Sequence, residues 1–205
     1  MKSKFVSIVD YGVGNIGSVY NMVSKLGFNC IITSDPKVLR DSEKIILPGV
    51  GSYDSAIKKL RANGLFDEIS YSVLELRKPI LGICLGMQLL GDSSKEGILK
   101  GFGFLKFRCE TFNDLKQSYN LKVPNMGWRE VSRLNSSILT NKLYVDSRYY
   151  FVHSYYIPND SYSVLTSYYG VSYCAGLSYE NIHGVQFHPE KSHKFGFQIF
   201  SNFLE

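Results

Sequence analysis

A cysteine flanked by two glycines is the residue of this sequence best suited to covalent chemistry. Cys84 stands in Gly82-Ile83-Cys84-Leu85-Gly86, after a buried-looking apolar run and before a helix-like one. The pattern G-x-C-x-G is the thiol version of a nucleophile elbow, in which the nucleophile lies on a strained turn above a sheet. A helix that begins at the cysteine adds free N–H groups, which favour a thiolate and a developing oxyanion. A buried, inert cysteine is the plainer alternative, but the spacing of the glycines favours a nucleophile.

A nucleophilic cysteine needs a general base, and His188 is the histidine in the most suitable setting. It stands in Phe187-His188-Pro189-Glu190, after a strand-like run. Pro189 is expected to hold the backbone extended, which places the side chains of His188 and Glu190 on the same side. Glu190 could then bond one imidazole nitrogen while the other faces Cys84. The other histidines lie in strand-like runs or in a polar tail: His153, His183 and His193.

A third element is the run Ile45-Ile46-Leu47, which continues into Pro48-Gly49-Val50-Gly51. In a parallel sheet this loop opens at the same carboxyl edge as the predicted elbow. Its backbone N–H groups, together with that of Leu85, could complete an oxyanion hole. The sequence therefore predicts that this loop and the cysteine turn lie at one edge of a sheet.

The elements that must position these residues alternate between strand and helix in the first half. Alternation of this kind predicts an α/β fold with a mostly parallel central sheet flanked by helices. In the second half, aromatic and β-branched runs separated by turn residues predict appended antiparallel strands. The clearest strand signals are residues 4–9, 28–33, 44–47 and 79–83, and the clearest helix signals are residues 16–26 and 65–76.

The composition is that of a globular chain and excludes several classes of function. The 205 residues are 44% hydrophobic and 20% charged, which suits a single domain over residues 1–205 with a full core. The net charge of +5 comes from scattered basic residues, so we expect no nucleic-acid partner. The sequence shows no membrane-spanning stretch and no signal peptide, which favours the cytoplasm. The four cysteines lack metal-site spacing and are interpreted as free thiols, with no metal.

One glycine-rich turn offers an alternative function. Gly12-Val13-Gly14-Asn15-Ile16-Gly17 follows a strand-like run and opens a helix-like one, which is the context of a dinucleotide-binding G-x-G-x-x-G motif. Gly12, Gly14 and Gly17 could then admit a pyrophosphate. A tight turn at a sheet edge or an interface is the other interpretation. Nothing downstream supplies hydride-transfer chemistry, so a dinucleotide-binding module remains a remote alternative.

Taken together, residues 82–88, 48–51 and 188–190 resemble the class I, or triad, glutamine amidotransferases. Within that family the chain is similar to the glutaminase subunits of imidazole glycerol phosphate synthase. The landmarks of that second resemblance are residues 10–15, 123–128, 150–155 and 184–193. A peptidase-like Cys-His hydrolase is a competing enzyme class, but it would show an acidic residue beside the elbow, and none stands there.

The resemblance implies a role for each site residue. Cys84 attacks the side-chain amide of glutamine, and His188, held by Glu190, passes a proton to the leaving ammonia. The resulting thioester is hydrolysed to glutamate, with no cofactor. The remaining implied roles are oxyanion N–H groups from Val50 and Leu85, and substrate contacts from Gly51, Gln88, Ser154 and Tyr155.

The resemblance also implies a partner: a synthase subunit with a β/α barrel, joined as a heterodimer, which takes the ammonia. Asn15 would face that partner, with Asn125 and Trp128 also at the interface. Asn125 and Arg129 depart from the subfamily pattern, which usually has His and Asn at these positions. The resemblance makes histidine biosynthesis the first expectation for the pathway, and these departures are the reason for the alternative, delivery of ammonia to a surface-sugar synthase.

Overall fold

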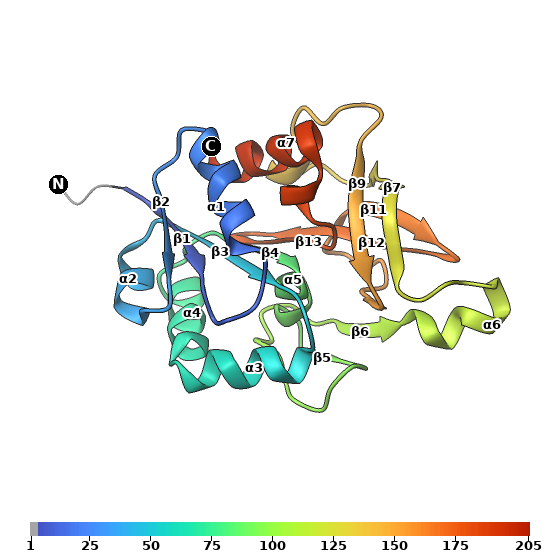
Figure 1. Cartoon of the computed structure of the whole chain (residues 1–205), viewed down its shortest axis with the longest axis horizontal. Coiled ribbons are helices and arrows are strands. Elements are labelled where there is room, and N and C mark those ends of the chain that lie inside the picture. The colour runs from blue at the N-terminus through green and yellow to red at the C-terminus, as the bar shows by residue number, and fades with distance from the viewer. Residues whose placement is uncertain (1–3) are drawn as a thin grey trace.

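An eight-stranded mixed sheet runs through the computed structural model, which describes residues 4–205 (Figure 1). The first five strands in spatial order are parallel, and the last three join them antiparallel. This arrangement confirms the predicted fold class. In spatial order the strands are β2 (Cys30–Thr33), β1 (Val6–Val9), β3 (Lys44–Gly49), β4 (Ile80–Cys84), β13 (Ile182–Val185), β12 (Val171–Tyr179), β11 (Ser163–Tyr169) and β8 (Ser132–Arg133).

Helices cover both faces of the parallel part of the sheet, as Figure 1 shows. One face carries α1 (Ile16–Lys25) and α7 (His193–Leu204). The other carries α2 (Pro36–Asp41), α3 (Tyr53–Ala62), α4 (Leu65–Leu74) and α5 (Leu85–Leu89). The central strands β1, β4 and β13 are buried along their whole length, as expected for parallel strands covered on both faces.

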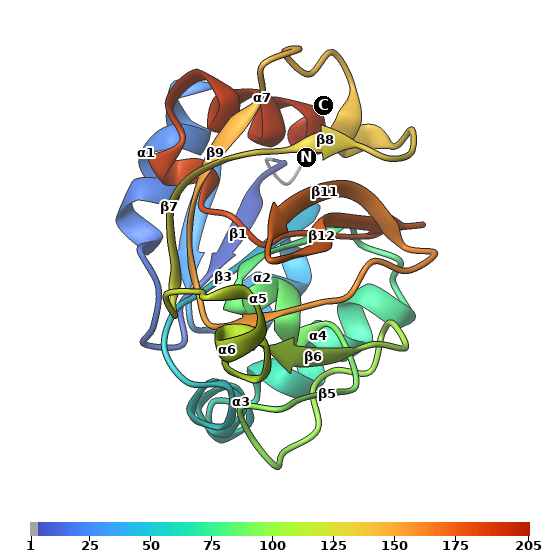
Figure 2. The same cartoon turned by 90° about the vertical axis from the view of Figure 1, so that its right-hand side faces the viewer.

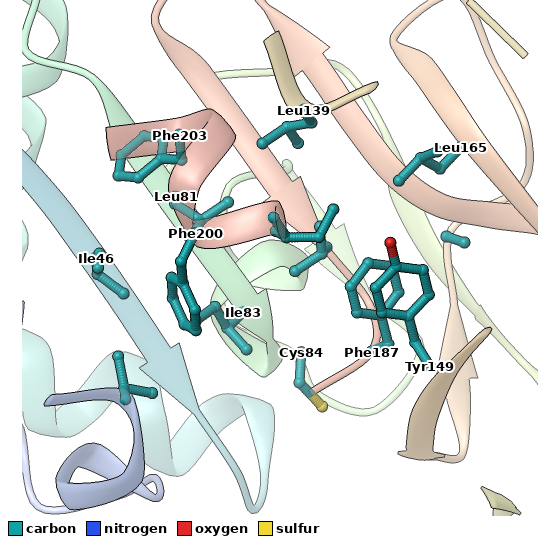
Figure 3. Close-up of a cluster of buried hydrophobic side chains, with 14 of the residues drawn as sticks. Ile46, Leu81, Ile83, Cys84, Leu139, Tyr149, Leu165, Phe187, Phe200 and Phe203 are labelled. Atoms are coloured by element: carbon teal, nitrogen blue, oxygen red, sulfur yellow. The ribbon is translucent and has the colours of Figure 1, made fainter. Parts of the chain in front are cut away.

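Each face of the sheet has its own hydrophobic core. On the α1 side, Val19, Met22 and Val23 are buried at helical spacing. They belong to the same cluster as Cys84, part of which is drawn in Figure 3. Within this cluster the rings of Tyr149 and Phe187 stack with centroids 3.8 Å apart (Figure 3). The cluster on the opposite face includes residues from α2, α3, α4 and α5.

Two smaller sheets lie beside the main one (Figure 2). One is an antiparallel ribbon of β7 (Asn125–Glu130) and β9 (Arg148–His153), and the other has the order β10 (Tyr155–Tyr156), β6 (Arg108–Thr111), β5 (Ser93–Ser94). The ribbon is tied to the main body by an antiparallel bridge between Tyr150 and His188. The remaining short helices are η1 (Phe112–Leu115), α6 (Lys116–Tyr119), η2 (Ile138–Thr140) and η3 (Pro189–Lys191).

The end of the chain differs from the sequence prediction. His193 does not lie in a polar tail, because it is the first residue of α7 and its ring stacks on Trp128 with centroids 5.7 Å apart. The apolar residues of α7, including Phe195, Ile199 and Phe203, are buried against the sheet at helical spacing. Within residues 4–205, no helix is both long and apolar enough to cross a membrane.

Candidate active site

Cys84 lies on a strained turn between β4 and α5. Its φ of 54° and ψ of −110° are unusual for a residue with a side chain, and Figure 3 shows its sulfur at the end of β4, pointing away from the labelled apolar side chains. The neighbouring glycines are required by close approach of the backbone. A Cβ at Gly86 would lie 1.8 Å from the carbonyl oxygen of Leu47, and one at Gly82 would lie 2.7 Å from the Gly86 backbone. The backbone therefore has the geometry that the G-x-C-x-G pattern predicts.

His188 and Glu190 form a buried pair. The Nδ1–H of His188 donates to Oε1 of Glu190 over 2.8 Å, and both side chains are almost fully buried. The sequence argument for this contact was wrong in one respect. Pro189 does not extend the backbone but begins the short helix η3, and this turn brings Glu190 back toward the ring. Ser192 holds the turn closed by donating from Oγ to the carbonyl of His188 over 2.6 Å.

The electrostatics of His188 favour its protonated form. Burial by itself lowers the pKa of His188, but the interactions with Cys84 and Glu190 outweigh burial and raise that pKa above its ordinary value. The other ring nitrogen, Nε2, is buried and makes no hydrogen bond to a nitrogen or oxygen within residues 4–205. It is therefore left for the cysteine and for a substrate, as a residue that moves protons requires.

A cavity of about 300 Å³ opens over Cys84. It brings together every residue for which the sequence implied an oxyanion or substrate role: Val50, Leu85, Gly51, Gln88, Ser154 and Tyr155. A hydrogen bond holds the loop that carries Val50 in place: the hydroxyl of the buried Tyr11 donates to the carbonyl of Pro48 over 2.9 Å. The cavity is large enough for a small amino-acid side chain with its backbone groups.

Glu96 also lines the cavity, although no local pattern in the sequence marked it. Burial raises the pKa of its carboxyl group above the ordinary value. The loop that carries it is anchored by Asp54, whose carboxylate accepts hydrogen bonds from the backbone N–H groups of Ile98 and Leu99. Glu96 comes close to Cys84 only through this tertiary arrangement, so reasoning from the sequence missed it.

A second residue missed by the sequence analysis is Gln186. Its side chain is fully buried, and its Nε2 donates to Sγ of Cys84 over 3.7 Å. Its Oε1 accepts from Nε2 of Gln88 over 2.9 Å, and the same nitrogen of Gln88 donates to the carbonyl of Tyr155 over 3.1 Å. In the sequence, Gln186 was marked only by its position two residues before His188.

The residues expected to face a partner divide into two groups. Asn15, just before α1, and Trp128, on β7, are exposed. Asn125 is fully buried, so its side chain does not form an interaction surface, contrary to the expectation. Its Nδ2 donates to Nε2 of His153 and to the hydroxyl of Tyr173, each over 3.1 Å, because β7 pairs with β9 and turns this position inward.

Asn125 contacts His153, another residue that lines the cavity, and this contact helps to set which ring nitrogen of His153 carries the proton. Burial lowers the pKa of His153 to about 4, so the ring is neutral near pH 7. Its Nδ1–H donates to the carbonyl of Tyr155 over 2.8 Å, and its Nε2 accepts from Asn125. Arg129 completes the contact by donating from Nε to Oδ1 of Asn125 over 3.0 Å. Asn125 and Arg129, the two residues that depart from the subfamily pattern, are thus hydrogen-bonded to each other.

The structure does not support the dinucleotide-binding alternative. None of Gly12, Gly14 and Gly17 lines the cavity over Cys84. The turn packs on the loop that carries Val50 instead: a Cβ at Gly14 would lie 3.6 Å from the side chain of Pro48. Lys59 on α3 secures the turn by donating to the carbonyl of Gly12 over 3.1 Å. A packed structural turn with positive φ explains Gly12 and Gly14, whereas a Cβ at Gly17 would meet no atom within 4 Å.

Known proteins match this chain over nearly its whole length. The family model described as glutamine amidotransferase class-I matches residues 7–205. Imidazole glycerol phosphate synthase subunit HisH 2 of Methanococcus maripaludis is 47% identical over 202 residues, or 98% of each chain. The protein of the same name from Pseudomonas aeruginosa is 42% identical, again over 98% of each chain. Subunit HisH of Leptospira borgpetersenii is 40% identical over 97% of this chain and 98% of its own.

Solved structures share the fold at lower identity. PurLQS from Thermotoga maritima gives a TM-score of 0.74 at 23% identity, covering 98% of this chain and 97% of the other. A glutamine amidotransferase from the same organism gives 0.61 at 17% identity, covering 93% of this chain and 77% of the other. With the family model and the close relatives, the chain belongs to the class I glutamine amidotransferases. The enzyme class that the motifs predicted is confirmed.

Proposed function

We propose that this chain is a glutaminase subunit in which Cys84 is the nucleophile, His188 the general acid and base, and Glu190 the group that orients His188. The observation that carries the proposal is the contact between two buried features, because Cys84 is one of the groups that raise the pKa of His188. One is a cysteine on a strained turn, and the other is a histidine whose Nδ1 is held by a carboxylate at 2.8 Å. Together they have the arrangement of a nucleophile, a base and an orienting group.

The chemistry follows from these positions. The sulfur of Cys84 attacks the side-chain amide carbon of glutamine, and the carbonyl oxygen becomes an oxyanion facing the backbone N–H groups of Leu85 and Val50. A well-placed donor of this kind contributes about 2.7–4 kcal/mol in the transition state. His188 gives a proton to the amide nitrogen, which leaves as ammonia while the C–N bond breaks. His188 then takes a proton from water, which attacks the thioester. The C–S bond breaks, glutamate is released, and Cys84 leaves as a thiolate beside the protonated His188.

Glu96 is the carboxylate that we assign to the ammonium group of the substrate. It lines the cavity together with Ser154 and Tyr155, so glutamine bound with its amide at Cys84 has its amino-acid end near these residues. Glu96→Gln keeps the size of the side chain and removes its charge. Because a hydrogen bond to a charged group contributes about 1.5–3 kcal/mol, we expect KM for glutamine to rise by about 10-fold or more with a smaller change in kcat.

Steady-state kinetics of the Glu96→Gln variant test this assignment. Glu110→Gln is a suitable control, because Glu110 is a nearby carboxylate that pairs with Lys95 and does not line the cavity. A KM for glutamine equal to that of the unchanged protein would remove Glu96 from the binding site.

We further propose that the ammonia passes to the cyclase subunit of imidazole glycerol phosphate synthase, in the cytoplasm, as part of histidine biosynthesis. The support is the set of relatives that carry the name of that synthase at 40–47% identity over nearly full length. The exposed side chains of Asn15 and Trp128 offer polar and aromatic contacts for a partner. We assign these two residues, and not Asn125, to the interface.

Glutamate production with and without a partner tests the proposed function. We expect glutaminase activity that rises strongly when the cyclase subunit from the same organism is added, and formation of the imidazole product with glutamine as the nitrogen donor. A matched reaction with a surface-sugar synthase distinguishes the alternative pathway. Stimulation by the surface-sugar synthase and not by the cyclase would replace the histidine assignment, and absence of glutamate under every condition would overturn the glutaminase itself.

A further inference from the structure

The buried amide of Gln186 lies directly between the nucleophile and Gln88. Its Nε2 is 3.7 Å from Sγ of Cys84 and its Oε1 is 2.9 Å from Nε2 of Gln88. The Gln186 side chain is fully buried. Its backbone is also fixed, because the Gln186 N–H donates to the carbonyl of Ala175 over 3.0 Å. Contacts of both its side chain and its backbone therefore hold Gln186 in place beside the sulfur.

The direction in which this amide points is set by its neighbours. The carbonyl of Tyr155 can only accept a hydrogen bond, so the group of Gln88 that faces it at 3.1 Å must be the NH₂. The same NH₂ faces Gln186, which must therefore present its oxygen to Gln88. The NH₂ of Gln186 is then the group that faces Cys84. The Tyr155 carbonyl thus fixes the orientation of the Gln88 amide, and Gln88 fixes that of the Gln186 amide. Gln186 therefore offers an N–H to the sulfur.

We propose that Gln186 is a further catalytic residue, whose side-chain N–H donates to the Cys84 sulfur and stabilises its anionic form. Gln88 is then a positioning residue for this donor as well as a part of the cavity wall. The proposal rests on the proposed function only in taking Cys84 as the nucleophile. It adds a second group that favours the thiolate beside His188, and one that carries no charge of its own.

The physical reason is the cost of a negative charge in a buried place. An anion that leaves water is stable only when nearby charges or hydrogen-bond donors replace its hydration. Cys84 is 6% exposed, so the thiolate depends on groups of the protein. A hydrogen bond to an ionised acceptor is stronger than one to the neutral form. The donor from Gln186 therefore lowers the energy of the thiolate more than that of the thiol.

The pH dependence of Cys84 alkylation by iodoacetamide tests the proposal without requiring any glutamine turnover. Gln186→Met keeps the length and volume of the side chain and removes the donor. Gln186→Glu keeps an acceptor for Gln88 but places a carboxylate at the sulfur. For Gln186→Met we expect the midpoint of the alkylation profile to move upward by about one pH unit, so that the rate below the midpoint falls about 10-fold. For Gln186→Glu we expect a larger upward move.

The control is Gln198→Met. Gln198 lies on α7 and donates to Asn202 over 2.9 Å, so its loss should leave the alkylation midpoint unchanged. The other three cysteines are also buried thiols. Peptide mass spectrometry therefore shows whether the label is on Cys84 or on one of them. Thermal unfolding of each variant shows that it is folded during the measurement.

The outcomes separate this proposal from the proposed function. Folded Gln186→Met and Gln186→Glu proteins with unchanged midpoints would overturn the catalytic role and leave Gln186 as a packing residue, even if the glutaminase is active. A shifted midpoint in a protein that forms no glutamate would support the donor and contradict the glutaminase instead. Gln186→Met should also lower kcat for glutamine by about the same factor as the alkylation rate.

Discussion

Cys84→Ser is expected to abolish glutamine hydrolysis, with kcat reduced by about 10⁴-fold or more. The serine hydroxyl has nearly the size of the thiol but stays protonated near pH 7, so His188 faces a much weaker nucleophile. The fold should be unaffected, because the strained backbone at this position depends on Gly82 and Gly86, where added Cβ atoms would contact backbone. Glutamate release measured with saturating partner and glutamine checks the expectation.

A matched cysteine elsewhere in the chain provides the control. Cys30 is also a buried free thiol, but it lies on β2 at the edge of the sheet, near Ser24. Cys30→Ser should leave kcat within a factor of two or so of the unchanged protein, in line with a role in packing only. Ammonia added directly should still support the partner in the presence of Cys84→Ser. Normal glutaminase activity of Cys84→Ser would show that the nucleophile is a different residue.

His188→Asn and Glu190→Gln should differ in severity. Loss of His188 removes proton transfer, a contribution of about 10²–10⁴-fold, and also removes the cation that favours the thiolate. Glu190→Gln keeps a hydrogen bond to Nδ1 but loses the negative charge beside the ring. The raised pKa of His188 should fall in this variant, since Glu190 is one of its causes. We therefore expect a smaller loss of kcat for Glu190→Gln than for His188→Asn.

The pH profile of kcat/KM gives a second measurement for this pair. In Glu190→Gln, the limb of the profile assigned to His188 should move to lower pH, because the imidazolium loses a stabilising negative charge. Ser192→Ala removes the hydrogen bond that closes the η3 turn. It should move this limb to lower pH by less than Glu190→Gln does. A greater loss of activity in Glu190→Gln than in His188→Asn would reverse the assigned roles.

The residues that sequence reasoning placed correctly all belong to short local patterns. The glycines at 82 and 86 mark the turn around Cys84 because the backbone of one strand and one helix must touch there. The alternation of strand and helix signals predicted the parallel strands and the edge at which they meet. His188 was chosen from its local pattern, after a strand-like run, and the structure adds that this strand, β13, pairs in parallel with β4.

The residues that it missed or misplaced depend on contacts between distant segments. Glu96 faces the cavity because Asp54, far from it in the sequence, holds its loop. Asn125 was expected at the surface, yet pairing of β7 with β9 turns it toward His153. Gln186 carries no marker except its spacing from His188. No propensity or periodicity encodes such contacts, since the partner segments are separated by many residues.

The central claim is that Cys84 is the nucleophile that attacks glutamine, and trapping it with an electrophilic glutamine analogue tests this most directly. A diazo ketone analogue, incubated with this chain and its partner and followed by peptide mass spectrometry, should label Cys84 alone. Excess glutamine should slow the labelling, and Cys84→Ser should take no label. A label on Cys30, Cys109 or Cys174, or an unlabelled protein that loses its glutaminase activity, would contradict the account.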